Sequence, residues 1–119
     1  MRRVPLELVT LLALSSIPLV LGIVNCAANL RAARKAYARV QVHKISSALA
    51  KYRERNGRCP TTRDDIFASE DERRHAFTDP WRDSIAYRCS DAGADVRSAG
   101  WDGIFNTPDD IEDSISWEP

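Results

Sequence analysis

The chain begins with an apolar stretch that is long enough to form a membrane helix. Residues 4–25, VPLELVTLLALSSIPLVLGIVN, carry a single charged side chain, that of Glu7. At about 1.5 Å per residue, a helix of this length approaches the thickness of the hydrocarbon core of a bilayer. Pro18 interrupts a helix in water but is tolerated in lipid. The pattern predicts an uncleaved signal anchor. A cleaved signal peptide and a lipoprotein signal at Cys26 are the alternatives.

Helical periodicity continues well beyond the apolar stretch. No Gly or Pro occurs from Ile23 to Asn56, and Gly57 and Pro60 then stop the helix. The sequence therefore predicts one helix of about 50 residues, with a first half that spans the membrane and a second half that packs on the rest of the chain. The apolar positions of the second half recur at alternating spacings of four and three, and they are Ala38, Val42, Ile45, Leu49 and Tyr52.

The remaining sequence predicts a small α+β domain. Residues 61–66 carry a Thr N-cap before a short helix, whereas 84–89 and 95–98 are typical of short strands. The segment from residue 99 to the end is rich in Gly, Asp, Asn and Pro and is predicted as loop. The expected organisation is a membrane anchor at 1–29 and a periplasmic domain at 30–119.

Charge is unevenly distributed along a chain of zero formal net charge. Residues 1–58 hold eleven Lys and Arg against two Asp and Glu, a net of +9, whereas residues 59–119 have a net of −9. This asymmetry favours head-to-tail attraction between copies or an acidic end that binds an ion. The alternative is an ordinary solvated surface.

Three cysteines are present, and none belongs to a CxxC pair, which argues against a zinc ribbon or a thioredoxin-type site. Cys59 and Cys89 both lie in the polar half, where an oxidising compartment would allow a disulfide. Such a bridge would close a loop of about 30 residues and stabilise the fold by roughly 3–4 kcal/mol. Two buried free thiols are the alternative.

The segment 98–111, SAGWDGIFNTPDDI, carries the clearest chemistry. Asp102, Asp109 and Asp110 place three carboxylates within nine residues, separated by turn residues. Carboxylate and carbonyl oxygens are the ligands that Ca²⁺ prefers, and Mg²⁺ is less favoured because it keeps its waters. The spacing differs from that of an EF-hand. Alternatively, Asp102 caps a turn and the other two carboxylates start a helix.

No enzyme motif occurs in the chain. The sequence has no nucleophile elbow, no HExxH and no phosphate loop, so we expect neither an enzyme nor a small-molecule substrate. His43 and His75 are interpreted as surface or packing residues. The basic helix alone does not indicate nucleic-acid binding.

Three segments in order resemble the major pseudopilin of type II secretion systems, the protein G family. They are 48–62 with NGRCPTT, 79–87 with DPWRDSIAY, and 98–111 with SAGWDGIFNTPDDI. The resemblance implies a pilin-like fold, a long N-terminal helix with a small antiparallel sheet, and a calcium ion in the C-terminal loop. Asp102 and Asp109 match the family's ligands best, and Asp110 and Ser98 match less closely.

The N-terminus departs from the family pattern, because RVPLEL replaces the prepilin peptidase motif. Glu7 is expected to stand in for the family's membrane-embedded glutamate and to act in assembly. The resemblance implies a structural subunit of the bacterial inner membrane, with its N-terminus cytoplasmic and its C-terminal domain periplasmic. Its partners would be the membrane, further copies, other pseudopilins and secretion-machine components. The alternative is a non-polymerising, membrane-anchored periplasmic binding or scaffold domain.

Overall fold

The computed structural model describes the backbone of residues 6–118 and the side-chain surroundings from residue 26 onward. The chain divides into two compact units, Met1–Ala33 and Arg34–Pro119. Helix α1 runs without a break over Leu6–Asn56, which confirms the prediction of one long helix ending at Asn56. Gly57 ends it with a positive φ of 69°, a conformation that glycine adopts at little cost.

The predicted single-pass location in the inner membrane is wrong. Among the residues that the structure describes, no helix is long and apolar enough to cross a membrane. The predicted span at residues 4–25 lies outside the part of the chain whose side chains the structure describes. The side chain of Glu7 lies outside the described part of the chain.

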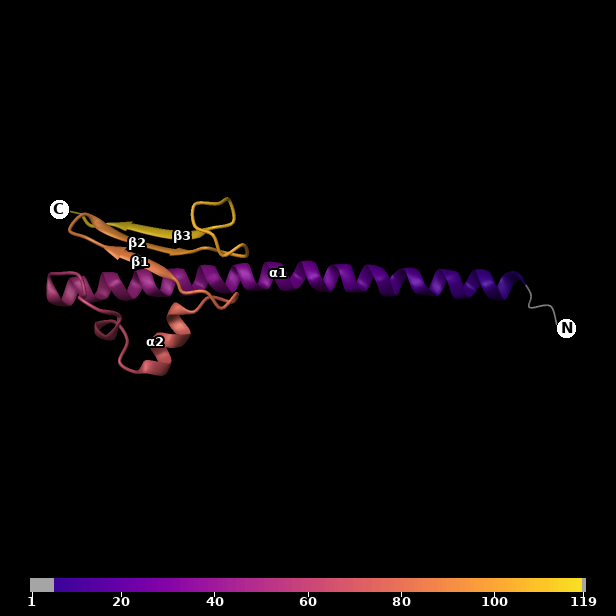
Figure 1. Cartoon of the computed structure of the whole chain (residues 1–119), viewed down its shortest axis with the longest axis horizontal. Helices are drawn as coiled ribbons and strands as arrows, with labels where there is room; N and C mark the ends of the chain where they lie inside the picture. The colour runs from indigo at the N-terminus through magenta and orange to yellow at the C-terminus, as the bar shows by residue number, and fades with distance from the viewer. Residues whose placement is uncertain (1–5, 119) are drawn as a thin grey trace. The chain divides into compact units, whose positions relative to one another are not determined.

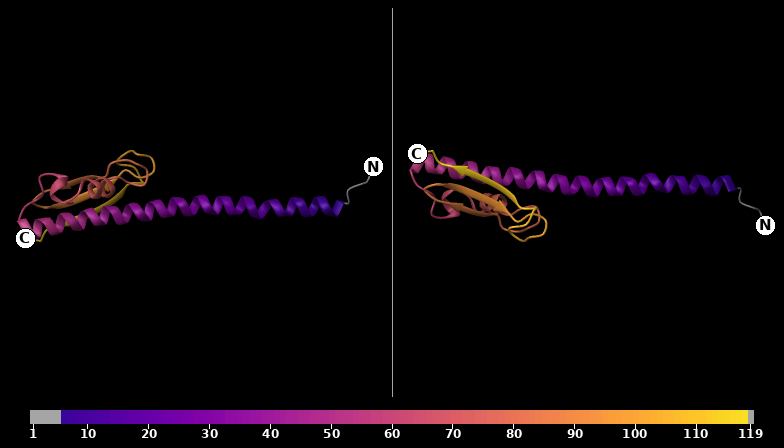
Figure 2. Two further views of the ribbon diagram at one scale, coloured as in Figure 1. Left: turned by 90° about the horizontal axis from the view of Figure 1, so that it is seen from below. Right: turned by 90° about the horizontal axis from the view of Figure 1, so that it is seen from above.

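The apolar stripe of α1 forms the centre of the core, as the spacing predicted. Ala38, Val42, Ile45 and Leu49 are each at most 1% exposed. They pack against residues from α2 and from the sheet, both of which lie along the second half of α1 (Figures 1 and 2). The other buried members of this core are Ala76, Phe77, Ile85, Ala94, Val96 and Ile111.

A three-stranded antiparallel sheet has the order β1-β2-β3, which confirms the predicted α+β class. The strands are β1 (Ala86–Cys89), β2 (Gly93–Ser98) and β3 (Ile111–Ser116). The third strand lies in the segment predicted as loop. Its sequence, IEDSIS, has few residues typical of strands, so its pairing with β2 and not its own propensity places it in the sheet.

Two short helical elements connect α1 to the sheet. The predicted short helix is a single 3₁₀ turn, η1 (Arg63–Asp65). Helix α2 (Glu70–Phe77) was not predicted, although its start carries an ordinary signal. The Ser69 hydroxyl accepts a hydrogen bond from the backbone N–H of Glu72 at 3.1 Å, as an N-cap residue does.

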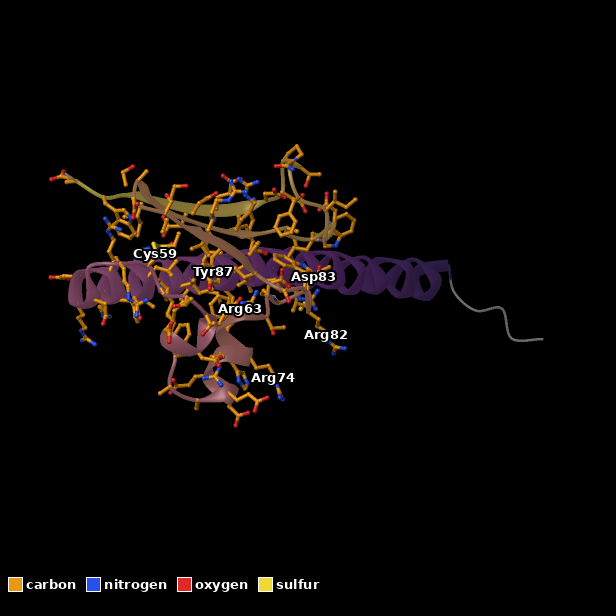
Figure 3. The ribbon with its side chains drawn as sticks, turned by 60° about the vertical axis from the view of Figure 1, so that its left-hand side comes forward. Cys59, Arg63, Arg74, Arg82, Asp83 and Tyr87 are labelled. Carbon is orange, nitrogen blue, oxygen red and sulfur yellow. A yellow bond between two sulfur atoms is a disulfide. The ribbon has the colours of Figure 1, made fainter. Side chains whose placement is uncertain are left out.

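A disulfide joins Cys59, just after α1, to Cys89 at the end of β1, with the two Cα atoms 5.9 Å apart. Figure 3 shows the bond beside the second half of α1. The bridge ties the end of the helix to the edge of the sheet across 30 residues of sequence.

Removing a core side chain tests whether the α1 stripe holds the fold together. Ile45→Ala deletes three carbons from a fully buried position, so we expect it to lower the free energy of unfolding by roughly 2–5 kcal/mol. Val40→Ala, on the same helix but 64% exposed, should change it by less than about 0.5 kcal/mol. Denaturant unfolding of the full chain measures both. Equal effects would contradict the assignment of the core.

Removing the disulfide tests the second constraint. The double variant Cys59→Ser/Cys89→Ser should lose about 3–4 kcal/mol, because the unfolded chain regains the entropy of an open 30-residue loop. Cys26→Ser provides the matched control, since Cys26 is free and exposed. A double variant that unfolds at the same denaturant concentration as this control would contradict the prediction.

Candidate metal centre

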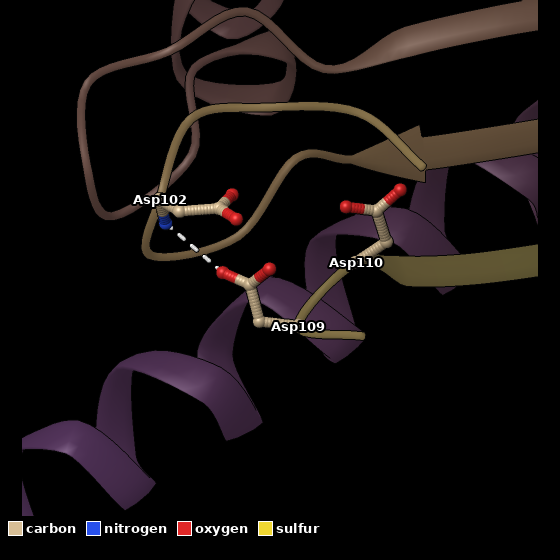
Figure 4. A group of neighbouring side chains, drawn as sticks. All are labelled: Asp102, Asp109 and Asp110. Atoms are coloured by element: carbon tan, nitrogen blue, oxygen red, sulfur yellow. Dashed lines mark hydrogen bonds between the residues drawn. The ribbon is translucent and has the colours of Figure 1, made fainter. Parts of the chain in front are cut away.

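Three carboxylates meet in the loop between β2 and β3. Asp102, Asp109 and Asp110 each offer one oxygen that lies within 4.8 Å of the others (Figure 4). The loop reverses the chain so that Asp102, near its start, faces the two acids at its end. These are the three carboxylates singled out in the sequence.

Each of these carboxylates uses one oxygen to hold the loop backbone. Asp109 accepts a hydrogen bond from the N–H of Asp102 at 2.9 Å, and Asp110 accepts one from the N–H of Asn106 at 2.7 Å. Asp102 accepts one from the N–H of Ile104 at 2.9 Å. The carboxylates are therefore oriented by the backbone, and each retains a second oxygen.

The second oxygens of Asp109 and Asp110 share one hydroxyl. The Oγ1 of Thr107 lies within hydrogen-bond distance of Oδ1 of Asp109, at 3.1 Å from Oδ1 of Asp110 and at 2.9 Å from the carbonyl oxygen of Ile104. A threonine hydroxyl has one hydrogen to donate, so it cannot serve all three acceptors at once. Two carboxylate oxygens and one carbonyl oxygen therefore meet at a single hydroxyl, which can donate to only one of them at a time.

No basic side chain neutralises this cluster within the part of the chain that the structure describes. None of the ion pairs there includes Asp102, Asp109 or Asp110. Arg97 is engaged by other acids, because its Nε lies 2.9 Å from Glu112 and its Nη2 lies 3.6 Å from Asp95. The loop thus holds three carboxylates without a compensating cation of its own.

Hydrogen bonds keep Asp109 in its charged form. The Thr107 hydroxyl, and after it the backbone N–H of Asp102, hold the pKa of Asp109 below its ordinary value of 3.8. Hydrogen bonds to a carboxylate favour the ionised state. Asp109 is therefore ionised at neutral pH.

Gly100 permits the close approach on which this arrangement depends. It has a φ of 73°, and a Cβ atom there would lie 2.3 Å from the carbonyl oxygen of Asp109. Any other residue would be strained in this conformation and would push the end of the loop away. Glycine at this position lets residues 100 and 109 touch.

Ser98 supports the loop through Asp79. Its hydroxyl donates to Oδ2 of Asp79 at 2.8 Å and accepts from the N–H of Gly100 at 3.2 Å. The other oxygen of Asp79, which is buried, accepts from the N–H groups of Trp81 and Asp83. The hydroxyl of Ser98 is thus directed toward Asp79 and not toward the three carboxylates.

Sequence reasoning missed the roles of Asp79 and Thr107. The sequence gives no local signal for the role of Asp79, because its partner Ser98 lies 19 residues away in sequence. Thr107 had a local signal, since it stands two residues before the first of the paired acids. The alternative that Asp109 and Asp110 start a helix is wrong, because strand β3 follows.

The donor set fits a hard divalent cation. Oxygen ligands lie about 2.3–2.6 Å from Ca²⁺, so two of them on opposite sides of the ion are at most about 5 Å apart. The 4.8 Å limit among the three carboxylates falls within that span. For Mg²⁺, with ligands at about 2.0–2.1 Å, the span would be only about 4.2 Å. The limit on these separations is therefore compatible with Ca²⁺.

The histidines do not form a catalytic grouping with this loop. His43 Nδ1 lies 3.1 Å from the carboxylate of Asp113 at the surface, and His75 Nδ1 lies 2.7 Å from the carbonyl oxygen of Asp71. These contacts involve no nucleophile.

Comparison with known proteins gives one match. No curated protein and no solved structure matches the chain. Residues 25–117 match the model of the family described as type II secretion system (T2SS), protein G. The match covers the second half of α1, the sheet and the loop that carries the carboxylates, in agreement with the three segments that resemble this family. The chain therefore belongs to the type II secretion system protein G family.

Proposed function

We propose that this pseudopilin subunit assembles with further copies through α1 and that its β2–β3 loop binds Ca²⁺. Family membership makes the chain a structural component of type II secretion, associated with other pseudopilins and with the secretion machinery. Assembly and calcium binding are the two further steps. Each has its own support among the described residues.

Exposed apolar side chains support assembly. Large apolar side chains gathered on a surface are typical of faces that other proteins cover. Here they lie on two parts of the chain, one on α1 and one on the β2–β3 loop. The exposed set comprises Leu30, Tyr37, Val40, Trp101, Ile104 and Phe105.

The geometry of the three carboxylates carries the calcium proposal. Three charged oxygen donors converge without a basic partner among the described residues, and one threonine hydroxyl is shared between two of them. A bound Ca²⁺ would supply the missing positive charge and hold the two ends of the loop together. The side chains of Asp102, Asp109 and Asp110 would be its ligands. Ser98 would hold the start of the loop through its hydrogen bonds to Asp79 and Gly100.

A thermal melt of the full chain with calcium and with chelator tests the proposal. At 100 times its dissociation constant, a ligand adds about 2.7 kcal/mol of stability, a shift of several degrees in a domain of this size. We expect Asp109→Ala to abolish this shift. Asp91→Ala, which removes an exposed acid from the β1–β2 turn, should keep it. Coincident melts with and without calcium in the unaltered chain would overturn the calcium site.

Acid should remove the calcium effect in a defined pH range. Because the folded pKa of Asp109 lies below 3.8, its carboxylate contributes stability that is present above pH 3.8 and lost as the pH falls through the lower folded value. We expect the calcium-induced shift to be similar at about pH 7 and pH 5 and to decrease as the pH falls below the ordinary value of 3.8. Asp109→Asn should show no shift at any of these values. A shift that already disappears near pH 6 would assign binding to a histidine instead.

A further inference from the structure

A groove lies between α1 and α2, on the surface that the calcium proposal does not use. It encloses about 440 Å³, and its walls include Tyr37, Val40 and Lys44 of α1 and Asp71 and Glu72 of α2. Tyr37 is 58% exposed and Val40 is 64% exposed, although both line a groove with residues of α2. Figure 1 shows α2 beside the second half of α1. The groove thus combines an apolar wall with acids at its rim, and Lys44 and His75 also line it.

Gln41 lines the same groove, and its side-chain oxygen accepts no hydrogen bond among the described residues. Its side chain is buried, with the residue only 6% exposed. Nε2 donates to the carbonyl oxygens of His75 at 2.9 Å and Thr78 at 2.7 Å. Since carbonyl oxygens only accept, these two bonds fix the orientation of the amide. Oε1 is then left without a partner in the described part of the chain, and it is closed off from solvent.

The acidic rim also lacks partners. Of the three acids in the first turn of α2, Glu70 pairs with Arg74 at 3.5 Å. Asp71 and Glu72 are exposed and form no ion pair within the described residues. Two free carboxylates and an aromatic ring together suit a cationic side chain with an apolar stem.

The chain itself presents such side chains on another face of α1. Lys35 and Arg39 are exposed and form no ion pair among the described residues. Each lies two positions from Tyr37, so at about 100° per residue each points about 160° away from the groove. A chain therefore cannot place its own Lys35 and Arg39 in its own groove.

We propose that the α1–α2 groove of one copy binds Lys35 and Arg39 of a second copy. The ammonium and guanidinium groups pair with Asp71 and Glu72, while Tyr37 and Val40 cover the aliphatic stems. Because the two surfaces lie on nearly opposite faces of one helix, the contact is heterologous and leaves a free groove and a free basic face at the ends. Such a contact adds copies one after another. This inference rests on the proposed assembly and names the surfaces that make it.

A charge exchange tests the pairing in the full chain. Asp71→Lys/Glu72→Lys and, separately, Lys35→Glu/Arg39→Glu each oppose like charges, and we expect each to raise the concentration needed for assembly at least about tenfold. The variant that carries all four changes restores opposite charges and should recover most of the loss. Glu54→Lys, an exposed reversal elsewhere on α1, is the matched control and should assemble normally. Sedimentation velocity at low salt measures assembly, and higher ionic strength should weaken it.

A milder variant controls for the possibility that the charge reversals unfold α2. Asp71→Asn/Glu72→Gln removes the charges without placing cations in the first helical turn, and circular dichroism checks that every variant is folded. Rescue by the four-fold exchange supports the pairing. If the unaltered chain assembles and the two charge-reversed variants assemble equally well, the pairing is wrong while assembly stands. If the unaltered chain stays monomeric at every concentration, both the assembly and the pairing are overturned.

Discussion

Burial of the apolar stripe of α1 is the interaction on which the rest of the second unit depends. A sheet of three strands, the longest of six residues, does not make a stable core by itself. Ile45 and Leu49 are fully buried and supply the apolar surface that the inward side of β2 needs at Val96. The disulfide from Cys59 to Cys89 adds a covalent constraint at the edge of this contact. Helix and sheet are therefore stable only together.

The pairing of β2 with β3 sets the geometry of the β2–β3 loop. The register of β2 with β3 pairs Ser98 with Ile111, so the two ends of the loop start from neighbouring positions. That pairing brings Asp109 next to the turn at Asp102, where the glycine at 100 permits contact. The Ser98–Asp79 hydrogen bond fixes the base of the loop to the preceding turn. Three like charges are thus held close by the fold, and a divalent cation would relieve their repulsion.

In the second unit, α1 is mainly basic and the elements that follow it are mainly acidic. Basic side chains stay exposed on α1, and acids gather on the elements that follow it, at the first turn of α2 and in the β2–β3 loop. The two acidic groups differ in their surroundings. In the loop the carboxylates face one another, as a cation site requires, whereas Asp71 and Glu72 border an apolar groove, as a surface for a basic side chain requires.

The sequence by itself determined the long helix, its buried stripe and the three acids of the candidate site, because each depends on local periodicity or on residue type. It did not determine β3, whose placement depends on pairing with β2, or the link from Asp79 to Ser98, which joins residues 19 positions apart. The apolar N-terminal stretch predicted a membrane span, but no described helix is apolar over a sufficient length. The groove with its unpaired Gln41 oxygen also came only from the tertiary structure. Contacts between elements are set by packing, and neither propensity nor spacing records which elements meet.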